Sequence, residues 1–265
     1  AQTHLQLMND LWMAIDRNEL RLLYQPKFHA PAGPVLGFEA LLRWQHPKQG
    51  LLTPDLFLPL AEKTGLIVPI GNWVINEACR QLREWHLQGH QSWSMAVNLS
   101  TLQFEQPSLV KTVLDCLALH QVPPEMLILE VTETTAMSNP DESVRVLTEL
   151  TDAGVKASID DFGTGYSSLL YLKRLPACEL KIDRAFVKEL SGESEDATIV
   201  SAIVALAKTL NLKVVAEGVE TEEQQTFLTE LGCNTLQGYL LGKPVSAQTI
   251  EALCARGEML PGAEQ

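Results

Sequence analysis

Short runs of apolar and β-branched residues recur along the whole chain, and most are separated by longer stretches in which apolar positions follow a helical spacing. Runs of this length between turn residues are typical of buried strands, and their alternation with helices indicates an α/β fold. The pattern predicts strands at residues 21–28, 36–44, 94–100, 127–133, 156–163, 179–184, 213–219 and 235–241.

The segments between these runs carry helix signals. Residues 140–154 begin with proline and acids and end with glycine, and residues 196–211 are apolar on one face. Parallel strands need a crossover of a dozen or more residues, and HAPAGPV between the first two runs is shorter than that. We therefore expect an α/β fold of the (β/α)8 TIM-like barrel type with an antiparallel first strand; an open doubly wound sheet is the structural alternative.

Each predicted strand carries a polar residue near its carboxyl end. In a (β/α)8 barrel, alternate side chains point inward and the strand ends form one rim, so these side chains could converge on one cavity. Single members could instead cap helices or pair with a lysine. That interpretation is weaker for the whole set, because a buried unpaired charge costs several kcal/mol per ion. The residues are Gln25, Glu39, Asn98, Glu130, Asp160, Lys181, Glu217 and Gln237.

The motif DDFGTG places two carboxylates, Asp160 and Asp161, side by side at the end of a predicted strand. Two carboxylates at a partly buried site repel each other unless a cation lies between them. A pair of divalent ions about 3.5–4 Å apart would resolve the repulsion. The oxygen-donor set favours Mg²⁺ or Mn²⁺ over structural zinc. The alternative is an ordinary Asp-rich turn exposed to solvent.

Composition narrows the possible partners. The 265 residues are 46% hydrophobic and 20% charged, as in an ordinary globular domain. A formal charge of −13 argues against duplex nucleic acid and an anionic membrane as partners of this segment. No apolar run approaches the roughly 20 residues that cross a bilayer. The 5 scattered cysteines, without a C-x-x-C pair, favour a reducing, cytoplasmic location, although the full-length protein could be membrane-anchored.

The N-terminal stretch THLQLMNDLWMAIDRNEL has the pattern of an amphipathic helix. Because the chain starts without methionine, we expect this helix to continue from an upstream regulatory domain of a longer protein. The predicted organisation is an N-terminal helix at residues 1–19, a barrel at residues 20–257 and a C-terminal tail at residues 258–265.

Seven motifs in order resemble the EAL domain of bacterial cyclic-di-GMP phosphodiesterases. The name-giving triplet is Glu39-Ala40-Leu41, and the resemblance spans roughly residues 20 to 253. It implies a barrel with an antiparallel first strand, and hydrolysis of cyclic di-GMP to linear pGpG with Mg²⁺ or Mn²⁺, inhibited by Ca²⁺. The motifs are YQP, NLS, LEVTE, DDFGTGYSSL, LKIDRAFV, VAEGVET and LQGYLLGKP.

The resemblance also implies roles for the rim residues. Glu39, Asn98, Glu130 and Asp160 are similar to the ligands of a first metal, and Asp160, Asp161 and Glu217 to those of a second. Lys181 resembles the lysine that contacts the attacking water. Glu217 is a metal ligand or the general base in such enzymes, and the sequence leaves that choice open. With Lys181 and Glu217, Glu39 completes the implied catalytic set.

Further positions are implied outside the metal ligands. Arg43 resembles an arginine that binds a substrate phosphate, for which a guanidinium is well suited. Gln25 and Gln237 are candidate substrate contacts, with packing at the rim as the alternative. Glu133 resembles the carboxylate that stabilises the DDFGTG loop, and residues 163–175 resemble a segment that forms a homodimer.

Three other functions compete with hydrolysis. The first is a receptor that binds cyclic di-GMP without cleaving it; the complete ligand set argues against this. The second is another metal-dependent barrel enzyme, such as one that stabilises an enolate on Mg²⁺ with a lysine base; strand spacing alone does not exclude it. The third is a scaffold for partner binding, which no local feature supports. His46, in RWQHP, is expected to be structural.

Overall fold

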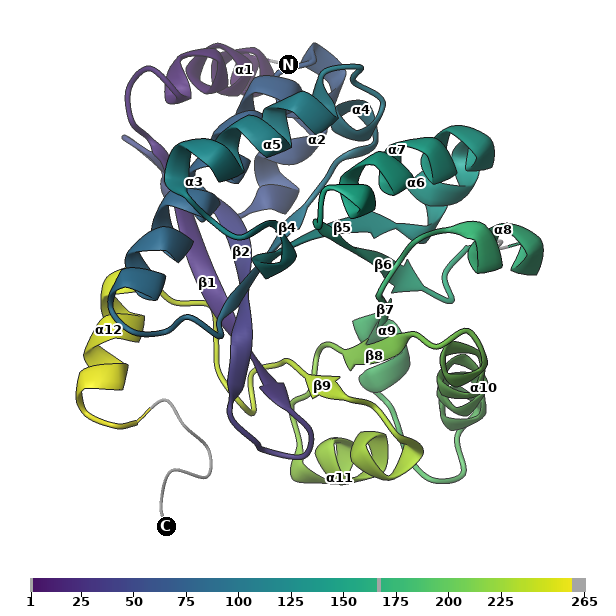
Figure 1. Cartoon of the computed structure of the whole chain (residues 1–265). Coiled ribbons are helices and arrows are strands. Elements are labelled where there is room, and N and C mark those ends of the chain that lie inside the picture. The colour runs from purple at the N-terminus through teal and green to yellow at the C-terminus, as the bar shows by residue number, and fades with distance from the viewer. Residues whose placement is uncertain (1, 166–167, 259–265) are drawn as a thin grey trace.

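The computed structural model describes residues 2–165 and 168–258, and its centre is a closed barrel of eight strands surrounded by helices (Figure 1). Around the barrel the order is β1-β9-β8-β7-β6-β5-β4-β2, and β2 pairs back to β1. The strands are β1 (Leu20–His29), β2 (Val35–His46), β4 (Ser94–Asn98), β5 (Leu127–Thr132), β6 (Lys156–Phe162), β7 (Glu179–Ile182), β8 (Lys213–Ala216) and β9 (Thr235–Leu236).

The first strand runs against its neighbours. β1 pairs antiparallel with both β2 and β9, whereas the pairs from β2 through β4 to β9 are parallel. The predicted barrel with an antiparallel first strand is confirmed, and the alternative of an open sheet is wrong because β1 closes the ring. A short additional strand, β3 (Gly50–Leu52), pairs with β2 outside the ring. Three residues are too few for the alternation that identifies strands from sequence.

Two predicted strands end three or more residues early, and four others end one or two residues early. The run predicted at residues 213–219 ends at Ala216, and that predicted at 235–241 ends at Leu236. A Cβ on Gly238 would lie 2.2 Å from the carbonyl oxygen of Val219, and the Val219 N–H donates to the carbonyl oxygen of Gln237, so the two segments lie with their backbones in contact. Apolar residues follow both strand ends, at Val219 and at Leu240 and Leu241, which is why the sequence pattern alone extends the strands.

Twelve α-helices in the described residues cover the outside of the barrel. The predicted helix at 140–154 is α7, with Pro140 in its first turn and the side chain of Asn139 as its N-cap. The helices are α1 (Gln2–Ala14), α2 (Pro54–Thr64), α3 (Ile67–Leu87), α4 (Thr101–Phe104), α5 (Leu109–His120), α6 (Glu133–Ser138), α7 (Pro140–Asp152), α8 (Leu169–Arg174), α9 (Arg184–Val187), α10 (Glu195–Thr209), α11 (Glu222–Leu231) and α12 (Ala247–Ala255).

The main apolar core lies between the barrel and its helices. It contains strand residues such as Leu129, Val131 and Leu180, which alternate with polar residues of the same strands. Because side chains of a strand alternate between two faces, this leaves the polar residues inside the barrel. The packing of the helices on the outer face of the barrel therefore holds the strands whose polar side chains form the candidate site inside it.

A second apolar cluster joins α1, α2 and the outer half of β2. It includes Leu11 of α1, Trp44 of β2 and Phe57 of α2. His46 at the end of β2 contacts Asp10 of α1 through Nε2 (2.8 Å), while its Nδ1 accepts backbone hydrogen bonds. This arrangement agrees with a structural His46. The domain boundaries at residues 19 and 257 stay predictions, and residues 259–265 of the expected tail lie outside the described residues.

Two further findings bear on the setting of this segment. All five cysteines are free. Among the helices of the described residues, none combines the length and the hydrophobicity that crossing a membrane requires.

Candidate active site

The inside of the barrel is charged. Glu39 of β2, Glu130 of β5 and Lys181 of β7 are no more than 5% exposed, although each carries an ionisable group. All three point away from the apolar core because their neighbours in each strand belong to it. The expectation of convergent polar strand residues therefore holds for these members.

Lys181 lies at the centre of this cluster. Its Nζ donates to Glu39 Oε1 at 2.6 Å and to Glu130 Oε2 at 3.0 Å. Glu217 Oε2 is 3.4 Å from the same nitrogen. One buried ammonium group is thus shared among three carboxylates that come from three different strands or strand ends.

Asp160 and Asp161 both take part in the site, although consecutive strand residues normally face opposite sides of a sheet. The register between β6 and β7 shifts between Ile159 and Phe162, and Asp161 has a φ of 51°. This irregularity turns the second carboxylate toward the first, and the Asp161 backbone N–H donates to Asp160 Oδ1 at 2.7 Å. A bulge of this kind re-aims a side chain next to a site.

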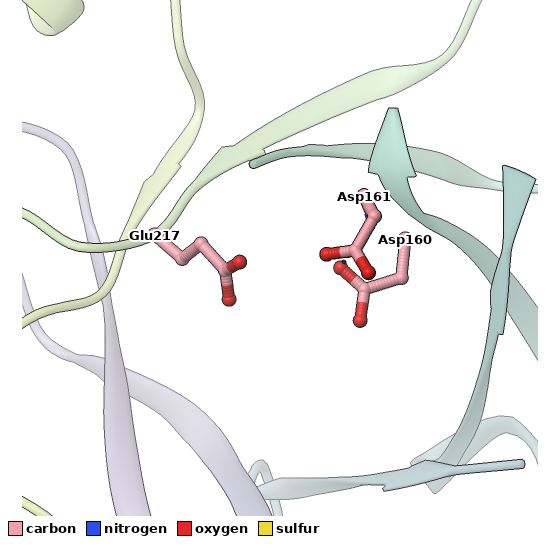
Figure 2. Close-up of side chains that lie close together, drawn as sticks. All are labelled: Asp160, Asp161 and Glu217. Atoms are coloured by element: carbon pink, nitrogen blue, oxygen red, sulfur yellow. Dashed lines mark hydrogen bonds between the residues drawn. The ribbon is translucent and has the colours of Figure 1, made fainter. Parts of the chain in front are cut away.

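Glu217 reaches the same space from the opposite wall. It follows the last residue of β8, and its carboxylate faces Asp160 and Asp161 (Figure 2). One oxygen from each of these three residues lies within 4.8 Å of the others. Three convergent carboxylate oxygens are suited to a divalent cation, so this is the candidate metal cluster in the described residues.

Three amide side chains border the acidic cluster. Asn98 at the end of β4 donates from Nδ2 to Glu39 Oε2 at 2.9 Å, which turns its Oδ1 away from this bond. Gln237 donates from Nε2 to Glu39 Oε1 at 2.8 Å and to Gln25 Oε1 at 2.9 Å. All three candidates therefore lie at the site, and Gln25 pairs with Glu39 in the antiparallel register of β1 and β2.

The ionisable residues of the cluster differ in the direction in which their pKa values are shifted. Burial opposes ionisation of Glu39, but the charge and hydrogen bond of Lys181 dominate and lower its pKa to about 2. Burial and the charge of Glu39 raise the pKa of Glu130 well above its usual value. Burial also raises the pKa of Asp160 and of Glu217 to about 7, against the attraction of Lys181. The pKa of Lys181 itself is raised, because the carboxylates outweigh its burial.

Two other predicted residues lie at the edge. Arg43 of β2 is half-buried, donates to the carbonyl oxygen of Leu42 at 2.8 Å, and has a pKa lowered by burial. Glu133 is buried at the start of α6, and its Oε2 accepts a hydrogen bond from the Gly163 backbone N–H at 2.8 Å. The second contact joins α6 to the loop after β6.

A cavity that reaches Asn98 was not predicted from the sequence. It has a volume of about 340 Å³ and lies between the end of β4 and helices α2 and α3. Asn98 and Leu41 line it on the side of the barrel, and Ile70 and Gly71 on the side of α3. A Cβ on Gly71 would lie 2.4 Å from the Gln103 side chain, so the glycine makes room for Gln103 and does not by itself predict a cavity.

This combination of a barrel with one reversed strand and an acidic rim around a lysine agrees with a comparison across protein families. The sequence profile of the EAL domain matches residues 8–244. The chain belongs to the EAL domain family.

Known relatives are similar over almost the whole chain. MucR of Pseudomonas aeruginosa, a bifunctional diguanylate cyclase/cyclic di-GMP phosphodiesterase, is 63% identical over 96% of this chain and 37% of its own length. The cyclic di-GMP phosphodiesterase NbdA of the same organism is 45% identical over 95% of this chain and 32% of its own length. The chain therefore spans about a third of these relatives.

Solved structures agree with the fold. The MucR phosphodiesterase in complex with c-di-GMP matches with a TM-score of 0.91 and 63% identity, over 92% of this chain and 99% of that one. The FimX EAL domain from Pseudomonas aeruginosa, bound to c-di-GMP, matches with a TM-score of 0.82 and 28% identity, over 90% and 96%.

Proposed function

We propose that this chain is a metal-dependent phosphodiesterase that hydrolyses one phosphodiester of cyclic di-GMP to linear pGpG. The observation that carries the proposal is the convergence of five carboxylates and Asn98 around Lys181 at one end of an EAL barrel. MucR and NbdA are named as cyclic di-GMP phosphodiesterases, which supports the same substrate here.

The donor set fits divalent ions. The carboxylates of Glu39, Glu130, Asp160, Asp161 and Glu217 carry more negative charge than the single ammonium of Lys181 offsets. Buried charge of one sign is costly unless it is paired, and carboxylate oxygens and an amide are the ligands that Mg²⁺ and Mn²⁺ prefer. We infer that one ion is held by Glu39, Asn98, Glu130 and Asp160, and another by Asp160, Asp161 and Glu217.

When bound, such a pair of ions lowers the pKa of the attacking water and offsets charge on the phosphate. Lys181 supplies fixed positive charge where negative charge develops on the phosphoryl oxygens. Glu217 has two proposed roles, as a ligand of the second ion or as the base that accepts the water proton, and these roles stay alternatives. Water adds to phosphorus, one P–O ester bond breaks, and the proton ends on the leaving ribose oxygen.

Substrate contacts lie around the ions. Arg43 is proposed to bind one phosphate of cyclic di-GMP through its guanidinium. The cavity beside Asn98, lined by apolar residues of α2 and α3, offers space next to the reacting phosphate. Contacts of Gln25 and Gln237 with substrate stay a prediction, and Glu133 is proposed to stabilise the loop after β6 through Gly163.

The decisive experiment is incubation of purified protein with cyclic di-GMP and Mg²⁺, followed by chromatography for pGpG. Accumulation of pGpG supports hydrolysis, and its loss on removal of the metal by EDTA supports the metal requirement. Tight binding of cyclic di-GMP with no product in Mg²⁺ or Mn²⁺ would instead indicate a receptor.

Ca²⁺ is expected to inhibit. It accepts oxygen ligands, but its larger radius and looser geometry orient water poorly. Titration of Ca²⁺ into the Mg²⁺ reaction should lower the rate toward background, with recovery on added Mg²⁺. Equal rates with Ca²⁺ and Mg²⁺ would contradict this assignment.

A homodimer through residues 163–175 is also proposed. Leu169 and Leu170 of α8 are 64% and 66% exposed, so an apolar surface follows the loop that carries Asp160 and Asp161. Residues 166–167 lie outside the described part. Light scattering of the wild type and of a Leu169→Asp, Leu170→Asp variant tests this, and a monomeric, fully active wild type would contradict it.

The context of the full-length protein is a further proposal. The relatives are about three times longer than the matched segment, which supports further domains in the full-length protein, and a regulatory domain upstream of this segment stays the prediction. The five free cysteines support a reducing, cytoplasmic compartment. Expression of the full-length protein, with activity compared before and after removal of the upstream part, tests the regulatory role.

A further inference from the structure

Two buried glutamines form a hydrogen-bond chain that ends on Glu39. Gln25 donates from Nε2 to the carbonyl oxygen of Gly242 at 3.1 Å. Gln237 donates from a single nitrogen to Gln25 Oε1 at 2.9 Å and to Glu39 Oε1 at 2.8 Å. The chain therefore runs from the segment between β9 and α12, through β1 and the end of β9, to a carboxylate at the centre of the site.

The orientation of each amide is fixed by its neighbours. Turning Gln237 around would place its oxygen against two oxygens, Gln25 Oε1 and Glu39 Oε1, with no donor between them. Gln25 must then accept from Gln237 through its Oε1 and donate to the carbonyl oxygen of Gly242 through its Nε2. Each of the three hydrogen bonds therefore has one possible donor and one possible acceptor, which assigns the orientation of both amides.

Because these side chains are buried, their hydrogen bonds are costly to lose. Gln25 is 8% and Gln237 2% exposed, so water does not readily replace a lost partner. Gly242 also requires its small size, because a Cβ there would lie 2.6 Å from the Pro26 side chain. The segment after β9 is thereby packed directly on β1, and its carbonyl anchors the chain.

We propose that Gln25 and Gln237 are positioning residues that hold the Glu39 carboxylate in the orientation needed for metal binding, through a hydrogen-bond chain anchored at the carbonyl of Gly242. Glu39 Oε1 is held between Gln237 Nε2 and Lys181 Nζ, and Asn98 holds its second oxygen. Partners of this kind orient a ligand, and their loss lowers metal affinity or activity about 10–100-fold. The inference rests on the proposed metal-dependent function and adds a role to the predicted substrate contacts.

The test uses Gln25→Met and Gln237→Met, since methionine keeps the length of glutamine and removes its amide. Gln25 makes no hydrogen bond to Glu39, yet Gln25→Met is expected to lower Mn²⁺ affinity about tenfold in calorimetric titration without substrate. It should lower kcat and leave KM for cyclic di-GMP within about twofold. The double variant should bind Mn²⁺ no more weakly than Gln237→Met, because both changes interrupt one chain.

Gln81→Met is the matched control. Gln81 is a buried glutamine of α3, its Nε2 makes no hydrogen bond within the described protein, and it lies outside the site. Its substitution should leave Mn²⁺ affinity unchanged. A raised KM with unchanged Mn²⁺ affinity in Gln25→Met would show a substrate contact alone, and a lowered Tm with unchanged affinity would show a structural role; either result overturns the inference.

A crystal structure of Gln25→Met separates this inference from the proposed function. We expect the Glu39 carboxylate to leave its place beside Lys181, whether or not the wild type cleaves cyclic di-GMP. A Glu39 Oε1 that stays at hydrogen-bond distance from Lys181 Nζ would overturn the positioning role, even in an active phosphodiesterase. If Glu39 is displaced in the variant and the wild type shows no turnover, the positioning role is supported and only the proposed reaction is refuted.

Discussion

Two buried regions of this molecule are made from opposite kinds of side chain. The cluster that joins α1, α2 and the outer half of β2 consists of apolar residues such as Leu11 and Phe57. The inside of the barrel instead buries Glu39, Glu130 and Lys181. Burying apolar surface stabilises a fold by roughly 25 cal/mol per Å², whereas burying charges costs more than their pairing reliably returns.

A single strand serves both regions. β2 contributes Glu39 to the barrel interior and Trp44 to the apolar cluster, only five positions further along. Stability and function are therefore assigned to different positions of the same strand. Changes in the apolar cluster should lower the free energy of unfolding and leave activity intact. Changes inside the barrel should lower activity and leave the fold intact.

The largest effect is expected from Glu39→Ala. The change removes a proposed metal ligand and the main partner of Lys181, so activity should fall at least about a thousandfold in the pGpG assay. The fold should persist, because Glu130 still pairs with Lys181 and the packed core is untouched. Glu19→Gln is the control, since Glu19 is also a buried glutamate but contacts Trp44 outside the site. An unfolded Glu39→Ala protein would make Glu39 structural and remove the contrast.

The next largest effect tests the apolar cluster. Leu11 is 1% exposed, and Leu11→Ala should lower the free energy of unfolding by about 3 kcal/mol through lost contacts and a cavity. Its neighbour Trp12 is 66% exposed, so Trp12→Ala should change stability by less than about 0.5 kcal/mol. Urea denaturation measures both. In Leu11→Ala the kcat of the folded fraction should be unchanged; a parallel loss of kcat would mean that the regions are coupled.

Much of this division was predictable from the sequence. The short connection between the first two strands fixed the antiparallel direction of β1, because no crossover fits there. The strand period explains Glu39, Glu130 and Lys181, since each lies between residues of the apolar core. These inferences depend only on local spacing, which a single sequence contains.

Other features depend on contacts between distant segments. The turning of Asp161 toward Asp160 needs the register shift between β6 and β7 and a positive φ, and neither follows from an Asp-Asp pair. The Gln25–Gln237 bond joins positions 212 residues apart in the chain. The cavity beside Asn98 depends on how α3 packs on the barrel. Three-dimensional packing decides all three.

A smaller effect concerns the pH dependence of metal binding. Burial raises the pKa of Asp160 and Glu217 to about 7, so both are mostly protonated at pH 6 and mostly ionised at pH 8. A divalent ion must displace these protons, so Mn²⁺ affinity should rise about tenfold per carboxylate from pH 6 to pH 8. Calorimetry measures this, and Glu217→Gln should remove one of the two contributions. An affinity that is flat over this range would contradict the raised values.

The stability of the metal-free protein should fall as the pH rises, whereas the affinity for Mn²⁺ should rise. The folded state binds protons on Asp160 and Glu217 more tightly than the unfolded chain does, because their pKa values are raised from about 4 to about 7. Their contribution to stability is therefore complete below about pH 4 and is lost as the pH rises to about 7. Urea midpoints in EDTA at pH 5 and pH 7 measure the loss. Substitutions Asp160→Asn and Glu217→Gln together should flatten the profile.

The smallest effect is expected at Gly163, which links the charged interior to an apolar contact. Gly163 has a φ of 99°, and a Cβ there would lie 2.8 Å from the Phe186 ring. Gly89 has a φ of 105° but no atom within 4 Å of such a Cβ, so Gly89→Ala measures the backbone strain alone. Gly163→Ala should cost about 1 kcal/mol more than Gly89→Ala in urea denaturation, because the ring must shift. It should also lower kcat, since the Gly163 N–H that bonds Glu133 lies only two residues after Asp161. Equal costs for the two substitutions, with kcat unchanged, would mean that the loop tolerates the contact and that the apolar surroundings do not position Asp160 and Asp161.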